Sequence, residues 1–193
     1  MRRFTIALAA SGLLAVGQTA TAAPVQWGGN GHWYDVVAFT PATWSGSLAD
    51  AATRTHLGLI GYLATITSQG EQDFIHGLTT TTAWIAASDE ELEGTWKWMG
   101  GPEAGTTFYV VGAAVQPGYS FWNGGEPNNL GNEDYGNVNW NGATGQWNDL
   151  GNGGVGTYIV EFSPQTVPEP ASLSLFAMAA IGAARALRRR SRA

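Results

Sequence analysis

The sequence predicts an α+β domain over residues 24–164, with two helices, small antiparallel sheets and a long loop region. Three observations support this prediction. Apolar residues recur at helical spacing in two segments of the first half, short β-branched and aromatic segments lie on either side of them, and Gly is dense over residues 100–156. Helices grouped ahead of a loop-rich half and closing strands are typical of an α+β rather than a parallel α/β domain.

The first predicted helix covers residues 43–57. Thr43 can act as its N-cap, because a threonine hydroxyl accepts a hydrogen bond from an unpaired amide of the first turn. Apolar residues then follow at helical spacing: Trp44, Leu48, Ala51, Ala52 and Leu59.

A second helix is predicted to begin after Ser68. The stretch SQGE at residues 68–71 matches a capping box, in which the serine side chain accepts an amide hydrogen bond and the glutamate reaches back. Its apolar face consists of Phe74, Ile75 and Leu78.

Short strands are predicted at residues 33–39, 83–87, 95–99 and 157–162, where β-branched and aromatic residues dominate. Trp84, Trp96 and Trp98 fall in these segments and are expected in the core.

Residues 1–22 have the form of a signal peptide. Arg2 and Arg3 precede an apolar run over residues 4–16, and Ala20-Thr21-Ala22 provides a cleavage site of the A-x-A type. The sequence therefore predicts an exported protein.

Residues 165–193 form a second processing segment. Pro168-Glu169-Pro170 precedes an apolar run over residues 173–184, and five arginines follow. The run is shorter than the about 20 residues of a stable span, but its basic flank favours transient contact with the inner membrane face. This order resembles the PEP-CTERM sorting tail of Gram-negative bacteria, which implies an exosortase as partner. A simple C-terminal anchor is the alternative that the Pro-Glu-Pro stretch disfavours.

The domain between these ends is strongly acidic. Arg54 and Lys97 are its two basic residues, and fourteen of the fifteen acids fall within it, which gives a net charge of −12 with His neutral. Such a charge excludes nucleic acid and anionic membranes as natural partners. The chain has no cysteine, so no disulfide can stabilise it.

Seven motifs occur in a recognisable order: ATWSGSLADAA, LATITSQGEQDFI, WIAASDEELEGTWKWMGG, FWNGGEPNN, NEDY, GQWNDL and TYIVEF. In order and spacing they resemble the C-type lectin domain over residues 30–163. The resemblance implies a double-loop α+β fold whose long loop region binds calcium and, through calcium, a sugar.

The resemblance implies a principal calcium site whose ligands also bind the sugar: Glu126, Asn128, Glu133, Asn148 and Asp149. It also implies a cis peptide before Pro127. Calcium takes six to eight oxygen ligands at about 2.3–2.6 Å, which suits a stretch rich in carboxylates and amides that lacks Lys, Arg, His and Cys. The E-P-N order implies selectivity for mannose-type hydroxyls, including those of glucose, N-acetylglucosamine and fucose, rather than galactose.

An auxiliary calcium site is implied by a second set of residues: Asp89, Glu93, Asn129, Glu133 and Asp134. Glu90 and Glu91, beside the first of these, are expected to be solvated surface charges.

The sequence departs from the family at the usual cysteines. Ala51 and Val160 occupy the positions of one disulfide, and Tyr135 and Asn152 lie at or near those of the other. Ala51 and Val160 can replace a disulfide by packing. At Tyr135 and Asn152 the disulfide that would hold the binding loops is missing, so we expect calcium to order these loops.

Several alternatives remain open at this level. Trp122 and Trp140 can stack on a sugar or pack beneath the loops, whereas His32, His56 and His76 are scattered and indicate no catalytic triad. Paired carboxylates occur in glycosidases, but here they are taken up as metal ligands, so no catalysis is expected.

The sequence thus predicts a non-catalytic, calcium-dependent carbohydrate-binding protein at the cell surface or in the extracellular matrix, with a self-produced exopolysaccharide as a reasonable ligand. The alternative is a structural or adhesive matrix protein that uses the same fold for protein or polysaccharide contacts.

Overall fold

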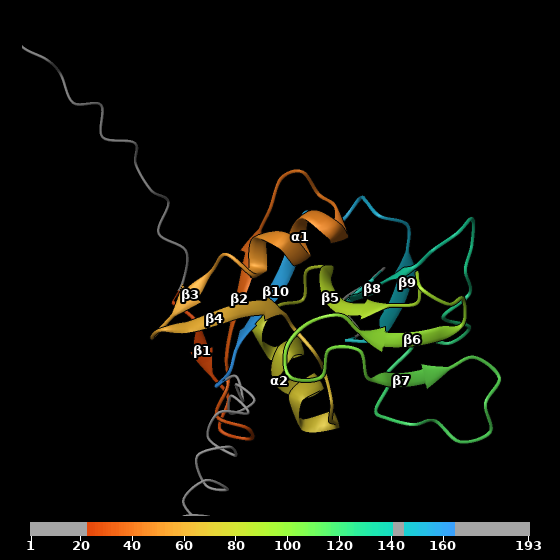
Figure 1. Ribbon diagram of the computed structural model, residues 1–193, viewed down its shortest axis with the longest axis horizontal. Helices are drawn as coiled ribbons and strands as arrows, with labels where there is room; N and C mark the ends of the chain where they lie inside the picture. The colour runs from red at the N-terminus through yellow and green to blue at the C-terminus, as the bar shows by residue number, and fades with distance from the viewer. Residues whose placement is uncertain (1–22, 141–144, 165–193) are drawn as a thin grey trace, which may run out of the picture.

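The computed structural model describes residues 23–140 and 145–164, which fold into a twisted sheet flanked by two helices (Figure 1). The helices are α1 (Trp44–Ala51) and α2 (Gln69–Leu78). The strands are β1 (Val25–Gln26), β2 (Trp33–Ala38), β3 (Thr55–His56), β4 (Leu59–Leu63), β5 (Ala83–Ser88), β6 (Thr95–Trp98), β7 (Thr107–Val110), β8 (Tyr135–Val138), β9 (Trp147–Leu150) and β10 (Thr157–Phe162). Neither helix in this described part is long and apolar enough to cross a membrane. Both processing segments lie outside the described residues.

The last strand, β10, joins the two halves of the sheet. It pairs antiparallel with β2 from Thr157↔Ala38 to Phe162↔Trp33, and antiparallel with β4. It also runs parallel to β5 at Tyr158↔Trp84. The expected antiparallel ladders are therefore present, but β10 links them into one mixed sheet. This arrangement agrees with the predicted α+β class.

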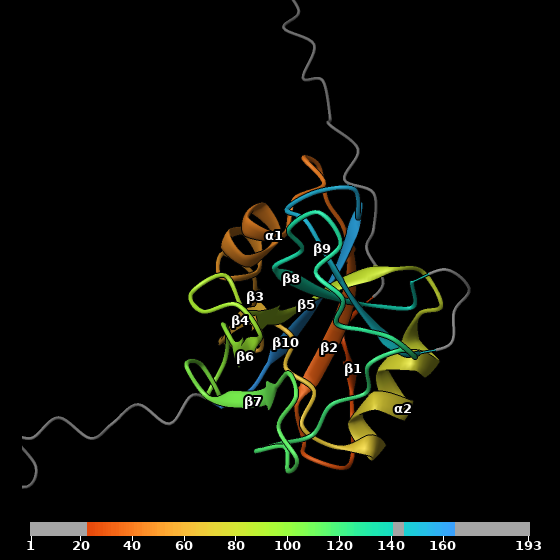
Figure 2. The same cartoon turned by 90° about the vertical axis from the view of Figure 1, so that its right-hand side faces the viewer.

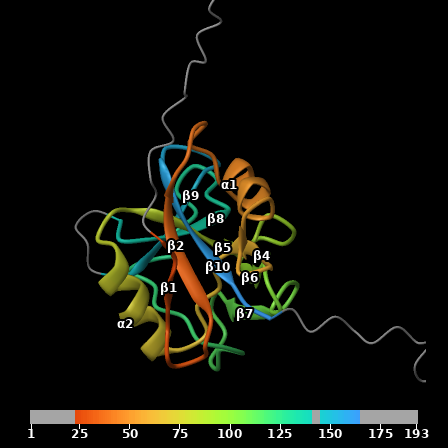
Figure 3. The ribbon, with the colours of Figure 1, turned by 90° about the vertical axis from the view of Figure 1, so that its left-hand side faces the viewer.

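The two helices lie on opposite sides of the β2–β10 pair (Figure 3). Helix α1 begins as predicted, because the Thr43 side chain accepts a hydrogen bond from the Gly46 amide at 3.1 Å. The predicted end at residue 57 is wrong. Leu57 and Gly58 have φ of 49° and 81° and form the turn between β3 and β4, so Leu59 belongs to a strand.

Helix α2 also begins as predicted, with the Ser68 hydroxyl accepting the Glu71 amide at 3.3 Å. The second half of the capping box differs from the prediction. Glu71 is buried, and its Oε2 accepts from the amide of Thr67 at 2.8 Å and from the Thr67 hydroxyl at 3.0 Å. The glutamate therefore fixes the chain one residue before the cap.

Ala51 and Val160, at the first pair of cysteine positions, are both fully buried. Both face Gly61 of β4: a Cβ atom there would lie 2.7 Å from Val160 Cγ2 and 2.8 Å from the Ala51 carbonyl oxygen. Glycine at residue 61 lets helix, strand and sheet approach closely, and dense packing occupies the place of the disulfide.

The second pair of positions is tied to the start of α1. Tyr135 stacks on Trp44, while the Asn152 side chain accepts from the Ser45 amide at 3.1 Å and donates to the Ser45 hydroxyl at 3.0 Å. Two separate contacts with one helix terminus thus hold both sides of the loop region.

Candidate functional site

The hairpin of β8 and β9 provides the base of the candidate site. The two strands pair antiparallel with Gly136 opposite Asp149 and Asn137 opposite Asn148. Asn148 and Asp149 are buried, and the Asn137 side chain donates to the Asn148 carbonyl at 2.9 Å. Figure 2 shows the segment before β8 running across this end of the sheet. The sequence did not predict this hairpin, which lies in the expected loop region.

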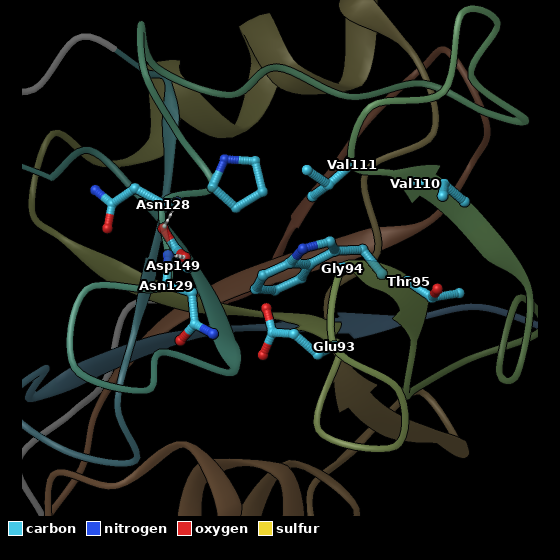
Figure 4. Close-up of a pocket in the computed structure, with 10 residues that line it drawn as sticks. Glu93, Gly94, Thr95, Val110, Val111, Asn128, Asn129 and Asp149 are labelled. Atoms are coloured by element: carbon cyan, nitrogen blue, oxygen red, sulfur yellow. Dashed lines mark hydrogen bonds between the residues drawn. The ribbon is translucent and has the colours of Figure 1, made fainter.

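Asp149 holds the E-P-N loop against β9. Its Oδ1 accepts a hydrogen bond from the backbone amide of Asn128 at 3.2 Å, and its Oδ2 accepts one from the backbone amide of Asn129 at 2.8 Å (Figure 4). The Glu126–Pro127 peptide is cis, as the resemblance implied. The neighbouring Asn148 side chain donates to the Asp149 carbonyl oxygen.

The turn after the E-P-N loop brings Glu133 back against that loop. The Leu130 amide donates to Asn128 Oδ1 at 2.8 Å and to Glu133 Oε2 at 3.1 Å, while the Glu133 amide donates to Asn129 Oδ1 at 2.7 Å. Asn129 has a φ of 51°, a conformation that asparagine adopts more readily than most residues. The structure thus brings the loop residues of the predicted principal site together with the two β9 residues.

Uncompensated negative charge characterises this first cluster, which consists of the predicted principal-site residues: Glu126, Asn128, Glu133, Asn148 and Asp149. Burial, together with the hydrogen bond and charge of Asp149 and the charge of Glu133, raises the carboxyl pKa of Glu126 to about 7. Burial and Asp149 also raise the pKa of Glu133. Glu126 Oε2 is buried and finds no hydrogen-bond partner among the described residues.

A second cluster comes from two separate loops, the one between β5 and β6 and the one before β8. Oxygen atoms of Asp89, Glu93 and Asp134 lie within 4.8 Å of one another. Asp89 Oδ2 accepts from the Gly94 amide at 2.8 Å, whereas the buried Asp89 Oδ1 has no hydrogen-bond partner in the described part of the chain. Burial raises the Asp89 pKa to about 6, with further contributions from Glu93, Asp134 and Asp149.

Three of the five predicted auxiliary residues therefore meet in this second cluster. Asn129 and Glu133 are engaged with each other in the adjoining turn. The charge of Asp149 acts on both Asp89 and Glu126, so the two clusters are electrostatically coupled.

Both clusters suit a hard cation. Their side-chain donors are oxygen atoms, and two buried carboxylate oxygens lack partners among the described residues. The basic residues of the described chain are engaged elsewhere, Arg54 with Asp50 at 2.8 Å and Lys97 with the exposed Glu91 at 2.7 Å. Calcium, which prefers many oxygen ligands, fits this donor set.

A pocket of about 390 Å³ adjoins the clusters (Figure 4). It is lined by Glu93, Gly94, Thr95, Trp96, Val110, Val111, Pro127, Asn128, Asn129 and Asp149. Sequence reasoning missed the contribution of Val110 and Val111. The β-branched and aromatic stretch TFYV was the available signal for their strand.

Trp122, which precedes the E-P-N loop, packs beneath the loops. The Trp122 ring lies 4.7 Å from that of Trp96 and 5.7 Å from that of Trp147. Trp140 is half-buried beyond the end of β8. The contacts of Trp122 favour a packing role over stacking on a sugar.

The three histidines have partners away from both clusters. His32 Nδ1 lies 2.6 Å from Glu161 Oε1, and His76 Nδ1 lies 3.1 Å from Asn139 Oδ1. The His56 ring packs against those of Trp33 and Phe162. His32 and His76 thus take part in polar contacts within the fold, and His56 takes part in ring packing.

The family follows from comparison with known proteins. The model of the C-type lectin domain matches residues 47–159, and the chain belongs to this family. The model of the PEP-CTERM protein-sorting motif matches residues 166–190, which marks the chain for export and exosortase-dependent sorting.

Individual relatives agree with this assignment. The chain is 44% identical to halomucin of Haloquadratum walsbyi over 140 residues, which are 71% of this chain but 2% of halomucin. It is 34% identical to lectin BRA-3 of Megabalanus rosa over 143 residues, 71% of this chain and 79% of that lectin. The fold is similar to the carbohydrate-recognition domain of cow CD23, with a TM-score of 0.54, 22% identity and coverage of 75% and 99%.

Proposed function

We propose that this chain is an exported, non-catalytic lectin that binds mannose-type sugars through calcium. The observation that carries the proposal is the convergence of E-P-N, the following glutamate and W-N-D on the β8–β9 hairpin, with the buried Glu126 Oε2 lacking a partner among the described residues. A cluster built only to stabilise the fold would gain nothing from crowding carboxylates with raised pKa values.

The principal ion would be held by five residues: Glu126, Asn128, Glu133, Asn148 and Asp149. The auxiliary ion would be held by a second set: Asp89, Glu93, Asn129, Glu133 and Asp134. Calcium supplies positive charge and coordination positions that two adjacent sugar hydroxyls can complete.

The chain's own residues position those hydroxyls. Asp149 fixes the backbone of Asn128 and Asn129, so the loop is set before a sugar arrives. The carboxylate of Glu126 accepts, and the amide of Asn128 donates, hydrogen bonds to the sugar. Reversing acceptor and donor across Pro127 would leave a polar atom unpaired with mannose-type hydroxyls, which is the basis of the proposed selectivity.

The processing segments complete the proposal. Residues 1–22 act as a signal peptide, residues 24–164 form the mature domain, and residues 165–193 contact the membrane transiently before an exosortase acts. The mature protein resides at the cell surface or in the extracellular matrix of a Gram-negative bacterium, and an exopolysaccharide is the proposed natural ligand.

An adhesive matrix function is the second candidate. It is favoured by Leu57 and Ile60, which are 73% and 58% exposed on the β3–β4 hairpin. This hairpin contributes no residue to either described acidic cluster. An apolar surface there would suit protein contact.

Affinity chromatography on immobilised mannose tests the primary proposal. The protein should be retained in calcium and released by EDTA or free mannose, and Glu126→Gln should pass through unretained. Glu90→Gln, an exposed neighbour of the second cluster, is the matched control and should behave as the unmodified protein. Retention that persists in EDTA would refute the calcium mechanism.

A further inference from the structure

The pocket beside the acidic clusters has two chemically different sides. Glu93, Asn128, Asn129 and Asp149 supply polar groups, whereas a second set supplies apolar surface: Trp96, Val110, Val111 and Pro127. Its volume of about 390 Å³ falls within the usual range for small-molecule sites, roughly 300–1,000 Å³. Figure 4 shows Val111 on the side opposite Asn128 and Asp149.

Val111 is held in place by backbone contacts. It directly follows β7, and its amide donates to the Gly94 carbonyl at 2.9 Å. The preceding pair in the ladder is Val110 opposite Thr95. Because Gly94 adjoins Glu93, this hydrogen bond fixes Val111 relative to a carboxylate of the second cluster.

The turn after β7 is fixed as well. The Gln116 side chain accepts from the Val110 amide at 2.8 Å and donates to the Val110 carbonyl at 3.1 Å. A strand end bonded on both sides offers a surface that is formed before a ligand binds. Such preorganisation reduces the entropy that binding must offset.

Val111 nevertheless remains 52% exposed. Leu92 and Leu130, which adjoin Glu93 and Asn129 in the sequence, are 61% and 77% exposed. Single exposed apolar residues are common, but a valine that lines a pocket opposite the buried Asp149 and the exposed Asn128 is a more specific feature. The pocket suits a ligand that carries both hydroxyl groups and an apolar group.

Resting on the proposed lectin function, we infer that this pocket selects saccharides that bear a methyl group, and that Val111 determines this specificity. The methyl group belongs either to an acetamido substituent or to a 6-deoxy position. A hydroxyl placed against Val111 would lose its hydrogen bonds with water and gain none, so the unsubstituted sugar binds less tightly.

Glucose, 6-deoxyglucose and N-acetylglucosamine form a matched ligand series, because they share the same 3- and 4-hydroxyl groups. We expect one or both methyl-bearing sugars to bind the full chain in calcium about fourfold more tightly than glucose, the ratio that one buried methyl group contributes. Which of the two gains affinity distinguishes the acetamido source from the 6-deoxy source.

Val111→Thr is the test variant, because it keeps the side-chain shape at a half-exposed position while adding a hydroxyl. It should bring the affinity ratio close to one, because the added hydroxyl can pair with a sugar hydroxyl and no longer favours a methyl group, and it should leave calcium affinity unchanged. Val115→Thr is the control, because Val115 is 84% exposed in the same turn and does not line the pocket. In the unmodified protein, NMR should detect nuclear Overhauser contacts between the sugar methyl group and the Val111 methyl groups.

The outcomes separate this inference from the proposed function. Equal affinity for all three sugars in the unmodified protein, or an unchanged affinity ratio in Val111→Thr, overturns the role of Val111. In either case, calcium-dependent binding of glucose still supports the lectin function. No binding of any of the three sugars in calcium overturns both.

Discussion

Tyr135 and Trp44 stack with ring centroids 4.7 Å apart and ring planes inclined by 28°. The contact joins the first residue of β8 to the first residue of α1. Trp44 also donates from Nε1 to the Ile85 carbonyl of β5 at 2.8 Å. One buried tryptophan therefore connects the hairpin beneath the candidate site with a helix and with a central strand, in a chain that has no disulfides.

Trp44→Ala should destabilise the domain by about 3–5 kcal/mol, the usual cost of removing a large buried aromatic side chain. Hydrogen exchange should rise first in β8 and β9, because the stacking contact acts on that hairpin. Trp44→Phe, which keeps an aromatic ring, should lose less. Thermal unfolding together with hydrogen exchange measures both effects, and unchanged exchange in β8 would contradict the proposed coupling.

Calcium should decide how well the loop over residues 124–134 is ordered. Without the ion, repulsion among Glu126, Glu133 and Asp149 opposes its closure, whereas Tyr135 and Asn152 keep the adjoining strands attached to α1. Limited proteolysis in EDTA should therefore cut within the loop and spare β8 and β9. Equal protection of the loop in EDTA and in calcium would contradict this prediction.

Calcium binding should release protons near pH 6.5. In the calcium-free domain the pKa is about 7 for Glu126 and about 6 for Asp89, so both carboxyl groups are partly protonated at that pH. Calcium affinity should accordingly fall as the pH drops through 7 towards 6. Calorimetry in two buffers with different ionisation enthalpies measures the released protons, and identical heats in both buffers would count against it.

The stability of the calcium-free domain should fall as the pH rises from 5.5 to 7.5. Raised carboxyl pKa values mean that the folded state holds protons which the unfolded chain releases near its ordinary values of 4.5 for Glu and 3.8 for Asp. The contribution of these groups is therefore fully present below about pH 4 and is lost as the pH rises through 6 to 7. In EDTA, Tm should be lower at pH 7.5 than at pH 5.5, and excess calcium should remove the difference. A Tm in EDTA that rises between pH 5.5 and pH 7.5 would contradict the raised pKa values of Glu126 and Asp89.

Glu126→Gln should separate calcium binding from folding. The substitution removes a buried charge that is repelled by Asp149, so Tm in EDTA at pH 7.5 should equal or exceed that of the unmodified protein. Calcium should then raise Tm less than in the unmodified domain. Differential scanning fluorimetry with Glu90→Gln as the matched control makes the comparison. A large loss of stability in EDTA would instead indicate a structural role for Glu126.

The elements with strong local signals could be predicted from the sequence. Thr43 and Ser68 mark the starts of both helices, and four strands fall where β-branched and aromatic residues cluster. The end of α1 could not be predicted, because Leu57 adopts a positive φ in a hairpin turn that depends on the pairing of β3 with β4.

The sequence motifs named the residues of the candidate site, but not the strands that support them. Strands β8 and β9 carry three buried polar side chains: Asn137, Asn148 and Asp149. Asn137 donates to the paired strand and Asp149 accepts from the loop, so the partners of these two come from residues distant in sequence. Gly136 is also needed there, since a Cβ atom would lie 2.6 Å from that of Ala87. The apolar side of the pocket depends on the hydrogen bond between Val111 and Gly94, a tertiary contact that no sequence motif marks.

Calorimetric titration of residues 24–164 with mannose tests the central claim most directly. These residues include every described strand and helix. We expect binding in millimolar calcium, none in EDTA, and weaker binding when Glu126→Gln is combined with Asn128→Asp. Clear calcium binding without any sugar binding would contradict the lectin mechanism and favour an adhesive role for the domain.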